Sequence, residues 1–160
     1  MKSLTRSAAS LLLMALCLPS LAGASSAPAT HEFRLDNGLK LIVREDHRAP
    51  VVVSQLWYKV GSSYETPGKT GLSHALEHMM FKGSAKLGPG ESSRVLRELG
   101  AEENAFTSDD YTAYYQVLAS DRLSVAFELE ADRLASLRLP PEEFNREIEV
   151  IKEERRLRTE

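Results

Sequence analysis

The stretch that most constrains the fold is GLSHALEHMMFKGS, residues 71–84, which sets two histidines and a glutamate in an otherwise apolar helical run. His74, Glu77 and His78 are three or four positions apart, so they share one face of a helix. Two imidazoles at positions i and i+4 can hold one metal ion, and the carboxylate beside them can act as a base. A hydrogen-bonded pair of structural histidines is the alternative interpretation.

Strand patterns precede and follow this helix. Two alternating runs around Asp36-Asn37-Gly38 predict a hairpin over 31–46, because Asn and Gly both tolerate positive φ. The β-branched and aromatic run VVVSQLWYKV, 51–60, predicts a strand that is buried at its start, and YTAYYQVLA, 111–119, predicts another. The polar string ENAFTSDD, 103–110, is typical of a loop.

Helical spacing and turn residues predict helices at 74–81, 91–99, 121–138 and 141–160. Gly100 is the expected left-handed stop of the second, and Ser120-Asp121 is the expected cap of the third. Pro141 opens the last helix, as proline often does. This order of elements predicts an α+β fold, and we expect an antiparallel-containing sheet with the helices packed on one face.

The last helix carries acidic residues near its apolar side. Glu147 and Glu154, two turns apart, fall along the edge of a stripe formed by Phe144, Ile148, Ile151 and Leu157. Carboxylates near a buried face are costly unless they are paired or bound to a metal. The alternative is that both are solvated acids of an acid-rich helix.

The first residues read as a targeting segment. Lys2 and Arg6 precede the apolar run AASLLLMALCL, and Ala22-Gly23-Ala24 follows, so 1–24 is predicted to be a secretory signal peptide of bacterial type. That pattern predicts a periplasmic or secreted protein with no stable membrane span after cleavage; an uncleaved anchor is the alternative. We expect 25–30 to be a flexible leader and 31–160 to be one domain, which continues in a longer protein.

Composition excludes several classes. The only cysteine, Cys17, lies in the predicted signal, so the mature chain offers neither a thiolate nor an internal disulfide. The net charge of -3 is spread along the chain, which predicts neither nucleic-acid binding nor a polybasic membrane patch.

The order H-x-x-E-H is the signature of the inverzincins. Together with it, four blocks resemble the amino-terminal domain of the pitrilysin/insulinase family of zinc peptidases, to which the mitochondrial processing peptidase with its beta-type subunit belongs. They are DNGLKLIVRED, WYKVGSSYETPGKTGLSHALEHMMFKGS, ENAFTSDDYTAYY and REIEVIKEERR, in the family's order.

The resemblance assigns roles to individual residues. It implies one zinc ion per chain held by His74, His78 and Glu154, with Glu77 as the general base and Glu147 as a supporting acid. Glu153 is the rival third ligand, although the seven-residue step from Glu147 favours Glu154. Asn104 and Ala105 match the family's edge-strand segment, which pairs with an extended substrate backbone. The chain departs from its relatives at 101–103, where they often carry glycines.

The resemblance also implies an activity. We expect 31–160 to be the amino-terminal part of a zinc-dependent endopeptidase that cleaves peptides or small unfolded proteins through a zinc-activated water. A second homologous domain or subunit would close a chamber around the peptide. The alternative is a non-catalytic scaffold or substrate-capturing subunit of a two-part peptidase.

Overall fold

The computed structural model describes residues 29–159, which form two units that divide after Asp46. The first unit is an antiparallel hairpin of β1, Thr30–Arg34, and β2, Lys40–Arg44. The predicted signal peptide and residues 25–28 of the predicted leader lie outside the described residues. Thr30 begins β1, so the expectation that the leader extends to Thr30 is wrong.

The predicted hairpin is confirmed, but its turn is built differently from the expectation. Gly38 alone takes positive φ, at 87°, and its N–H donates to the carbonyl of Leu35 at 2.9 Å. Asn37 contributes its side chain instead, because Oδ1 accepts the Leu39 N–H at 3.1 Å. The turn therefore uses one left-handed glycine after a tight turn, as three-residue hairpin loops commonly do.

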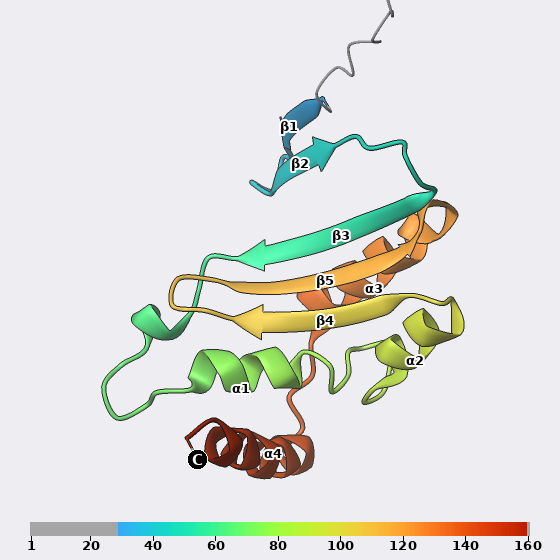
Figure 1. The fold of residues 1–160 in the computed structure, drawn as a ribbon. Helices are drawn as coiled ribbons and strands as arrows, with labels where there is room; N and C mark the ends of the chain where they lie inside the picture. Colours follow the sequence, from blue (N-terminus) through green and yellow to red (C-terminus); the bar gives the residue numbers. More distant parts are fainter. Residues whose placement is uncertain (1–28, 160) are drawn as a thin grey trace, which may run out of the picture. The chain divides into compact units, whose positions relative to one another are not determined.

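The second unit, from His47 onward, is built on an antiparallel sheet of order β3-β5-β4 (Figure 1). Its strands are β3, Val51–Tyr58; β4, Glu102–Thr107; and β5, Thr112–Ala119. Its helices are α1, Leu72–Met79; α2, Glu91–Glu98; α3, Leu123–Ser136; and α4, Pro141–Thr159, with 3₁₀ turns η1, Ser62–Tyr64, and η2, Ser120–Arg122. The predicted α+β class is confirmed.

The helices pack on one face of this sheet, as predicted. Tyr114, Gln116 and Leu118 of the central strand β5 are buried on that face. The helix α3 packs on β3 and β5, whereas α1 and α2 pack on β4. On the opposite face Val51 is 50% exposed, so the expectation that β3 is buried at its start is wrong. Because helices cover only one face of the sheet, alternate side chains of β3 are half-buried and the others are exposed.

An arginine lies inside the core between α3 and the sheet. The side chain of Arg133 pairs with Glu130, and its guanidinium lies 4.6 Å from the ring centroid of Tyr114 and 5.2 Å from that of Phe81. These contacts compensate a buried charge by ion pairing and by cation–π attraction. Through Phe81 they also brace the segment that follows α1.

Two predicted helix boundaries have different outcomes. Gly100, at a φ of 72°, follows α2 in the left-handed conformation, which confirms the predicted stop. The cap predicted at Ser120-Asp121 is wrong. These residues form η2, and α3 begins at Leu123 without a side-chain cap.

The string predicted to be a loop is a strand over most of its length. β4 pairs with β5 from Glu102↔Val117 to Thr107↔Thr112, and only the residues after Thr107 form the connecting turn. Its polar character arises because alternate side chains face solvent while those of Glu103, Ala105 and Thr107 are half-buried. Strand pairing with β5 thus overrides a weak local preference.

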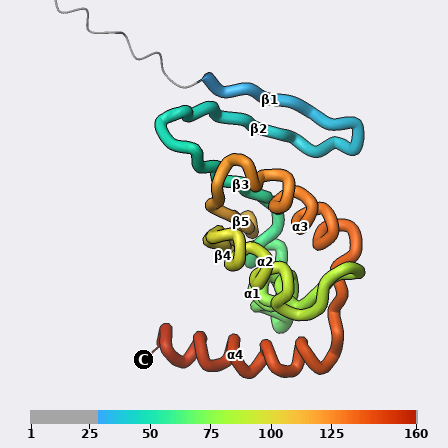
Figure 2. The backbone as a smooth tube through the Cα atoms, turned by 90° about the vertical axis from the view of Figure 1, so that its right-hand side faces the viewer, coloured from blue at the N-terminus to red at the C-terminus, as the bar shows by residue number. Residues whose placement is uncertain are grey.

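α1 runs beside β4, and α4 packs against α1 (Figures 1 and 2). The predicted stripe of α4 is partly wrong: Leu157 is 73% exposed, whereas Glu147 is buried. Carboxylates of α4 therefore occupy its inner side, where apolar side chains were expected. This packing brings residues 74–78 next to residues 147–154.

The approach of Gly61 to the β4–β5 turn generates a stability prediction. A methyl group at Gly61 would overlap the backbone oxygens of Ser108 and Asp109, whereas one at Gly88 would meet only the flexible Glu91 side chain. Gly61→Ala is expected to lower the free energy of unfolding by about 1–3 kcal/mol, the usual cost of overpacking. Urea unfolding followed by the fluorescence of Trp57 measures this, with Gly88→Ala as the matched control. Equal stability of the two variants would contradict the packing described.

Candidate metal centre

The helix α1 is held at its amino end by a glutamate from the preceding loop. The carboxylate of Glu65 accepts the Gly71 N–H at 2.6 Å and the Ser73 N–H at 2.7 Å. These bonds satisfy donors that the first turn of a helix leaves free, and they hold the pKa of Glu65 below its ordinary value. Sequence patterns missed Glu65, because it caps from six and eight positions away.

The two imidazoles of α1 converge on one carboxylate of α4. His74 Nε2 and His78 Nε2 are 3.2 Å apart. Glu154 Oε2 lies 3.4 Å from His74 Nε2, and Glu154 Oε1 lies 3.7 Å from His78 Nε2. The structure therefore brings together, from two helices, the three side chains that the sequence proposed as ligands.

These three groups fit a zinc ion. In a tetrahedral site with ligand distances of about 2.0–2.1 Å, the ligand atoms stand about 3.3 Å from one another. The two Nε2 atoms are 3.2 Å apart, and each of them lies 3.4–3.7 Å from a different oxygen of the Glu154 carboxylate, which is close to that edge length. Glu154 Oε2 is shielded from water and has no hydrogen-bond partner among the described residues. Glu153, the rival ligand, is exposed and pairs with Arg156.

Glu147 orients the second histidine. Its Oε2 lies 2.9 Å from His78 Nδ1, and its Oε1 lies 2.5 Å from Lys82 Nζ. Burial works to raise the pKa of Glu147, but the bonds to Lys82 and His78 together hold it below the ordinary value. With Nδ1 donating to Glu147, the lone pair of His78 lies on Nε2, the atom that faces His74 and Glu154. The sequence predicted a supporting role for Glu147 but gave no indication of Lys82.

Glu77 lies on the same side of α1 and contacts β4. It is buried, and the hydroxyl of Thr107 donates a hydrogen bond to its Oε2. Thr112 Oγ1 lies 3.4 Å from Thr107 Oγ1 and donates to the carbonyl of Val60 at 3.0 Å. The candidate base is thus fixed by the end of the β4–β5 hairpin, a tertiary contact that no local pattern could indicate.

A hollow of about 430 Å³ adjoins the three candidate ligands, and Asn104 and Ala105 also border it. β4 is an edge strand, paired only with β5. The N–H of Ala105 donates to the Asn104 side chain at 2.8 Å, so it lies outside the ladder with β5. A free strand edge therefore runs along the cluster of candidate ligands, His74, His78 and Glu154, which is called the metal-binding cluster below.

Comparison with known proteins shows the family. The family described as Insulinase (Peptidase family M16) matches residues 40–158, and the chain belongs to it. The zinc protease PqqE of Helicobacter pylori is 38% identical over 136 residues, 84% of this chain and 31% of that protein. The mitochondrial-processing peptidase subunit beta of Bos taurus is 36% identical over 126 residues, 79% of this chain and 26% of that subunit.

Solved structures agree with this assignment. The crystal structure of a protease from Helicobacter pylori matches 82% of this chain, and 32% of its own, with a TM-score of 0.79 and 37% identity. The crystal structure of pitrilysin matches 74% of this chain, and 13% of its own, with a TM-score of 0.68 and 31% identity. The chain therefore spans about a third or less of the length of these relatives.

The capping role of Glu65 predicts a pH-dependent effect. Because its pKa is lowered on folding, the charged carboxylate stabilises the fold above the ordinary value of 4.5, and this is lost as pH falls through the lowered pKa. Glu65→Gln is expected to cost about 1 kcal/mol at pH 7, the usual size of a helix cap. Little of that difference should remain at pH 3. Urea unfolding at both pH values measures it.

The control for this comparison is Glu128→Gln, since Glu128 is exposed on α3. It is expected to leave the free energy of unfolding unchanged at both pH values. A Glu65→Gln deficit of the same size at pH 7 and pH 3 would contradict the capping role.

Proposed function

We propose that the protein containing this chain is a zinc-dependent endopeptidase that acts on peptides or small unfolded proteins. The observation that carries this proposal is the convergence of two imidazoles and an otherwise unpaired carboxylate oxygen beside a buried glutamate. Membership of the insulinase family and the similarity to proteins named zinc proteases support it.

His74, His78 and Glu154 would hold one zinc ion per chain. When bound, zinc acidifies water and polarises the carbonyl of the peptide bond. Glu147 holds His78 in the tautomer that leaves Nε2 available, and Lys82 balances the charge of Glu147. Glu77 serves as the general base, and Thr107 fixes its Oε2 so that Oε1 is left to receive the proton.

The substrate would bind as an added strand on the free edge of β4. A main-chain carbonyl of an extended peptide would accept the Ala105 N–H in place of the Asn104 side chain. This bond would hold the peptide beside the metal site. This mode uses backbone groups that every peptide offers, which suits cleavage with little dependence on sequence.

A second homologous domain or subunit would complete the binding chamber. The short length of the chain relative to its relatives supports this part of the proposal. A non-catalytic, substrate-capturing subunit is the alternative. The presence of both histidines, Glu77 and Glu154 in one cluster favours the enzyme.

We also propose a periplasmic or secreted location, on the signal-like pattern of residues 1–24. Among residues 29–159, no helix combines the length and the hydrophobicity of a membrane span.

The ligand assignment predicts different outcomes for two neighbouring glutamates. Glu154→Ala is expected to weaken zinc affinity by more than about 100-fold, because loss of an outer partner alone costs 10–100-fold. Glu153→Ala should leave zinc affinity unchanged, since Glu153 contacts only Arg156 on the surface. Zinc stoichiometry and competition with a chromogenic chelator measure both. Loss of zinc from Glu153→Ala with retention by Glu154→Ala would reverse the assignment.

The base assignment predicts that Glu77→Gln separates metal binding from activity. The full-length variant should keep one zinc per chain but lose about 100- to 10,000-fold in kcat on a quenched fluorescent peptide. Glu98→Gln, an exposed substitution on α2, is the matched control and should cleave normally. Full activity in Glu77→Gln, or in zinc-free wild type, would contradict the proposed mechanism.

A further inference from the structure

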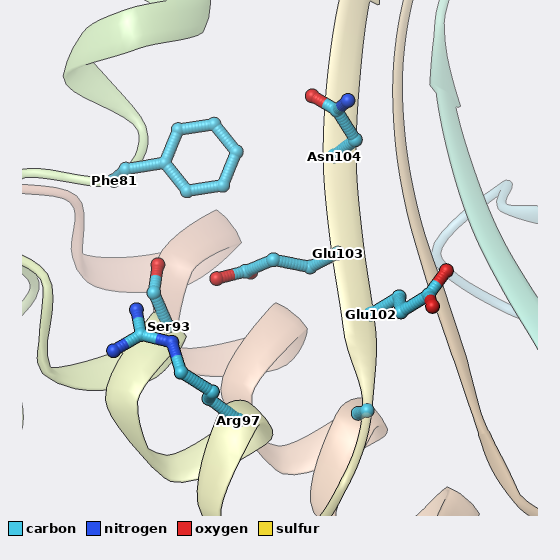
Figure 3. A pocket seen from close by; sticks show the side chains of 7 residues that line it. Phe81, Ser93, Arg97, Glu102, Glu103 and Asn104 are labelled. Carbon is cyan, nitrogen blue, oxygen red and sulfur yellow. The ribbon is translucent and has the colours of Figure 1, made fainter.

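A second hollow, of about 550 Å³, lies beside the metal-binding cluster between α2 and the start of β4 (Figure 3). Its walls include Phe81, Ser93, Arg97, Glu103 and Asn104. Phe81 and Asn104 also border the hollow around the candidate ligands, so the two spaces adjoin. A peptide laid along β4 would pass both.

Glu103 extends from β4 into this hollow, and Figure 3 shows its carboxylate directed toward Ser93 and Phe81. Its Oε1 is shielded from water and has no hydrogen-bond partner among the described residues. An unpaired, shielded carboxylate oxygen is costly, and a small rotation of the Glu103 carboxylate toward the hollow would let a ligand supply the missing donor.

Arg97 stands across the hollow on α2, next to Ser93 (Figure 3). Arg97 is exposed, and no ion pair with it is observed among the described residues. Two glutamates, Glu102 and Glu103, also border the hollow. The Glu102 side chain points away from Ser93 and Phe81 in Figure 3, so Glu103 and Arg97 are the two charged side chains that face one another, unpaired, across the hollow.

The geometry of β4 relates this hollow to the bond that would be cleaved. Glu103 and Ala105 share the half-buried face of β4, two residues apart. Two residues of a strand span about 7 Å. A substrate peptide would be held as an added strand at Ala105. One of its residues, within two positions of the cleaved bond, would then place its side chain over Glu103.

We propose that this hollow is a side-chain subsite that selects the carboxamide of glutamine or asparagine; the proposal rests on the proposed peptidase function. A carboxamide donates its N–H to Glu103 and accepts from Arg97 or Ser93, while its aliphatic stem packs on Phe81. A lysine side chain meets the charge of Arg97, and a glutamate meets that of Glu103. An apolar side chain leaves Glu103 unpaired.

The test uses full-length, zinc-loaded protein silenced by Glu77→Gln, so that binding is measured apart from cleavage. Peptides of one sequence carry Gln, Met, Lys or Glu at each position within two residues of the bond that wild type cleaves. At one of these positions the peptide with Gln should bind about tenfold or more tightly than the peptide with Met, because hydrogen bonds to charged groups contribute that much affinity. The same order should appear in wild-type kcat/KM.

Two variants in the silenced protein should move the preference in opposite directions. Glu103→Gln leaves Arg97 alone and should shift the preference toward Glu. Arg97→Met leaves Glu103 alone and should shift it toward Lys. Glu98→Gln is the matched control, because Glu98 is exposed on α2 and does not border the hollow, and it should keep the preference for Gln.

No preference for Gln at any position overturns the subsite, as does a preference that both variants leave unchanged. Either result would leave the proposed peptidase function intact, provided that wild type still cleaves the peptides. Wild type that binds zinc but neither binds nor cleaves any peptide of the series overturns both. Circular dichroism confirms that each variant is folded before its binding is interpreted.

Discussion

The packing of α4 across α1 is the interaction on which the site depends. It places Glu154 opposite two imidazoles that α1 presents one turn apart, and it places Glu147 against the far nitrogen of His78. Polar groups line this contact where two helices would usually bury apolar side chains. Such a seam is stable only if its groups are paired, and Glu147 pairs with both His78 and Lys82. Glu154 Oε2 faces His74 Nε2 at 3.4 Å but has no hydrogen-bond partner among the described residues, as expected for an atom that would bind a metal.

The edge strand β4 runs beside the cluster of His74, His78 and Glu154. One half-buried face presents Thr107 to the candidate base, Ala105 to the free edge beside the ligands, and Glu103 to the second hollow. In the proposed function, residues at a period of two along β4 would position the base, bind the peptide backbone and select a side chain in turn. The rigid pairing with β5 gives all three a common register.

Local patterns predicted the elements that local physics determines. The hairpin at Gly38, the helix with His74 and His78, and the left-handed Gly100 all follow from turn chemistry or helical spacing. β4 was misjudged because its strand character comes from pairing with β5. Glu65, Lys82 and Thr107 were missed because each acts on a residue brought near by folding. Spacing alone left Glu154 open, and it was proposed on the family resemblance.

The proposed site holds one zinc ion between two imidazoles of α1 and a carboxylate of α4. X-ray absorption spectroscopy at the zinc edge, on the full-length protein with one equivalent of zinc, tests this coordination. We expect scattering from two imidazole rings with oxygen donors completing the shell, and one imidazole fewer in His78→Ala. A shell of oxygen donors alone, or one that His78→Ala leaves unchanged, would contradict it.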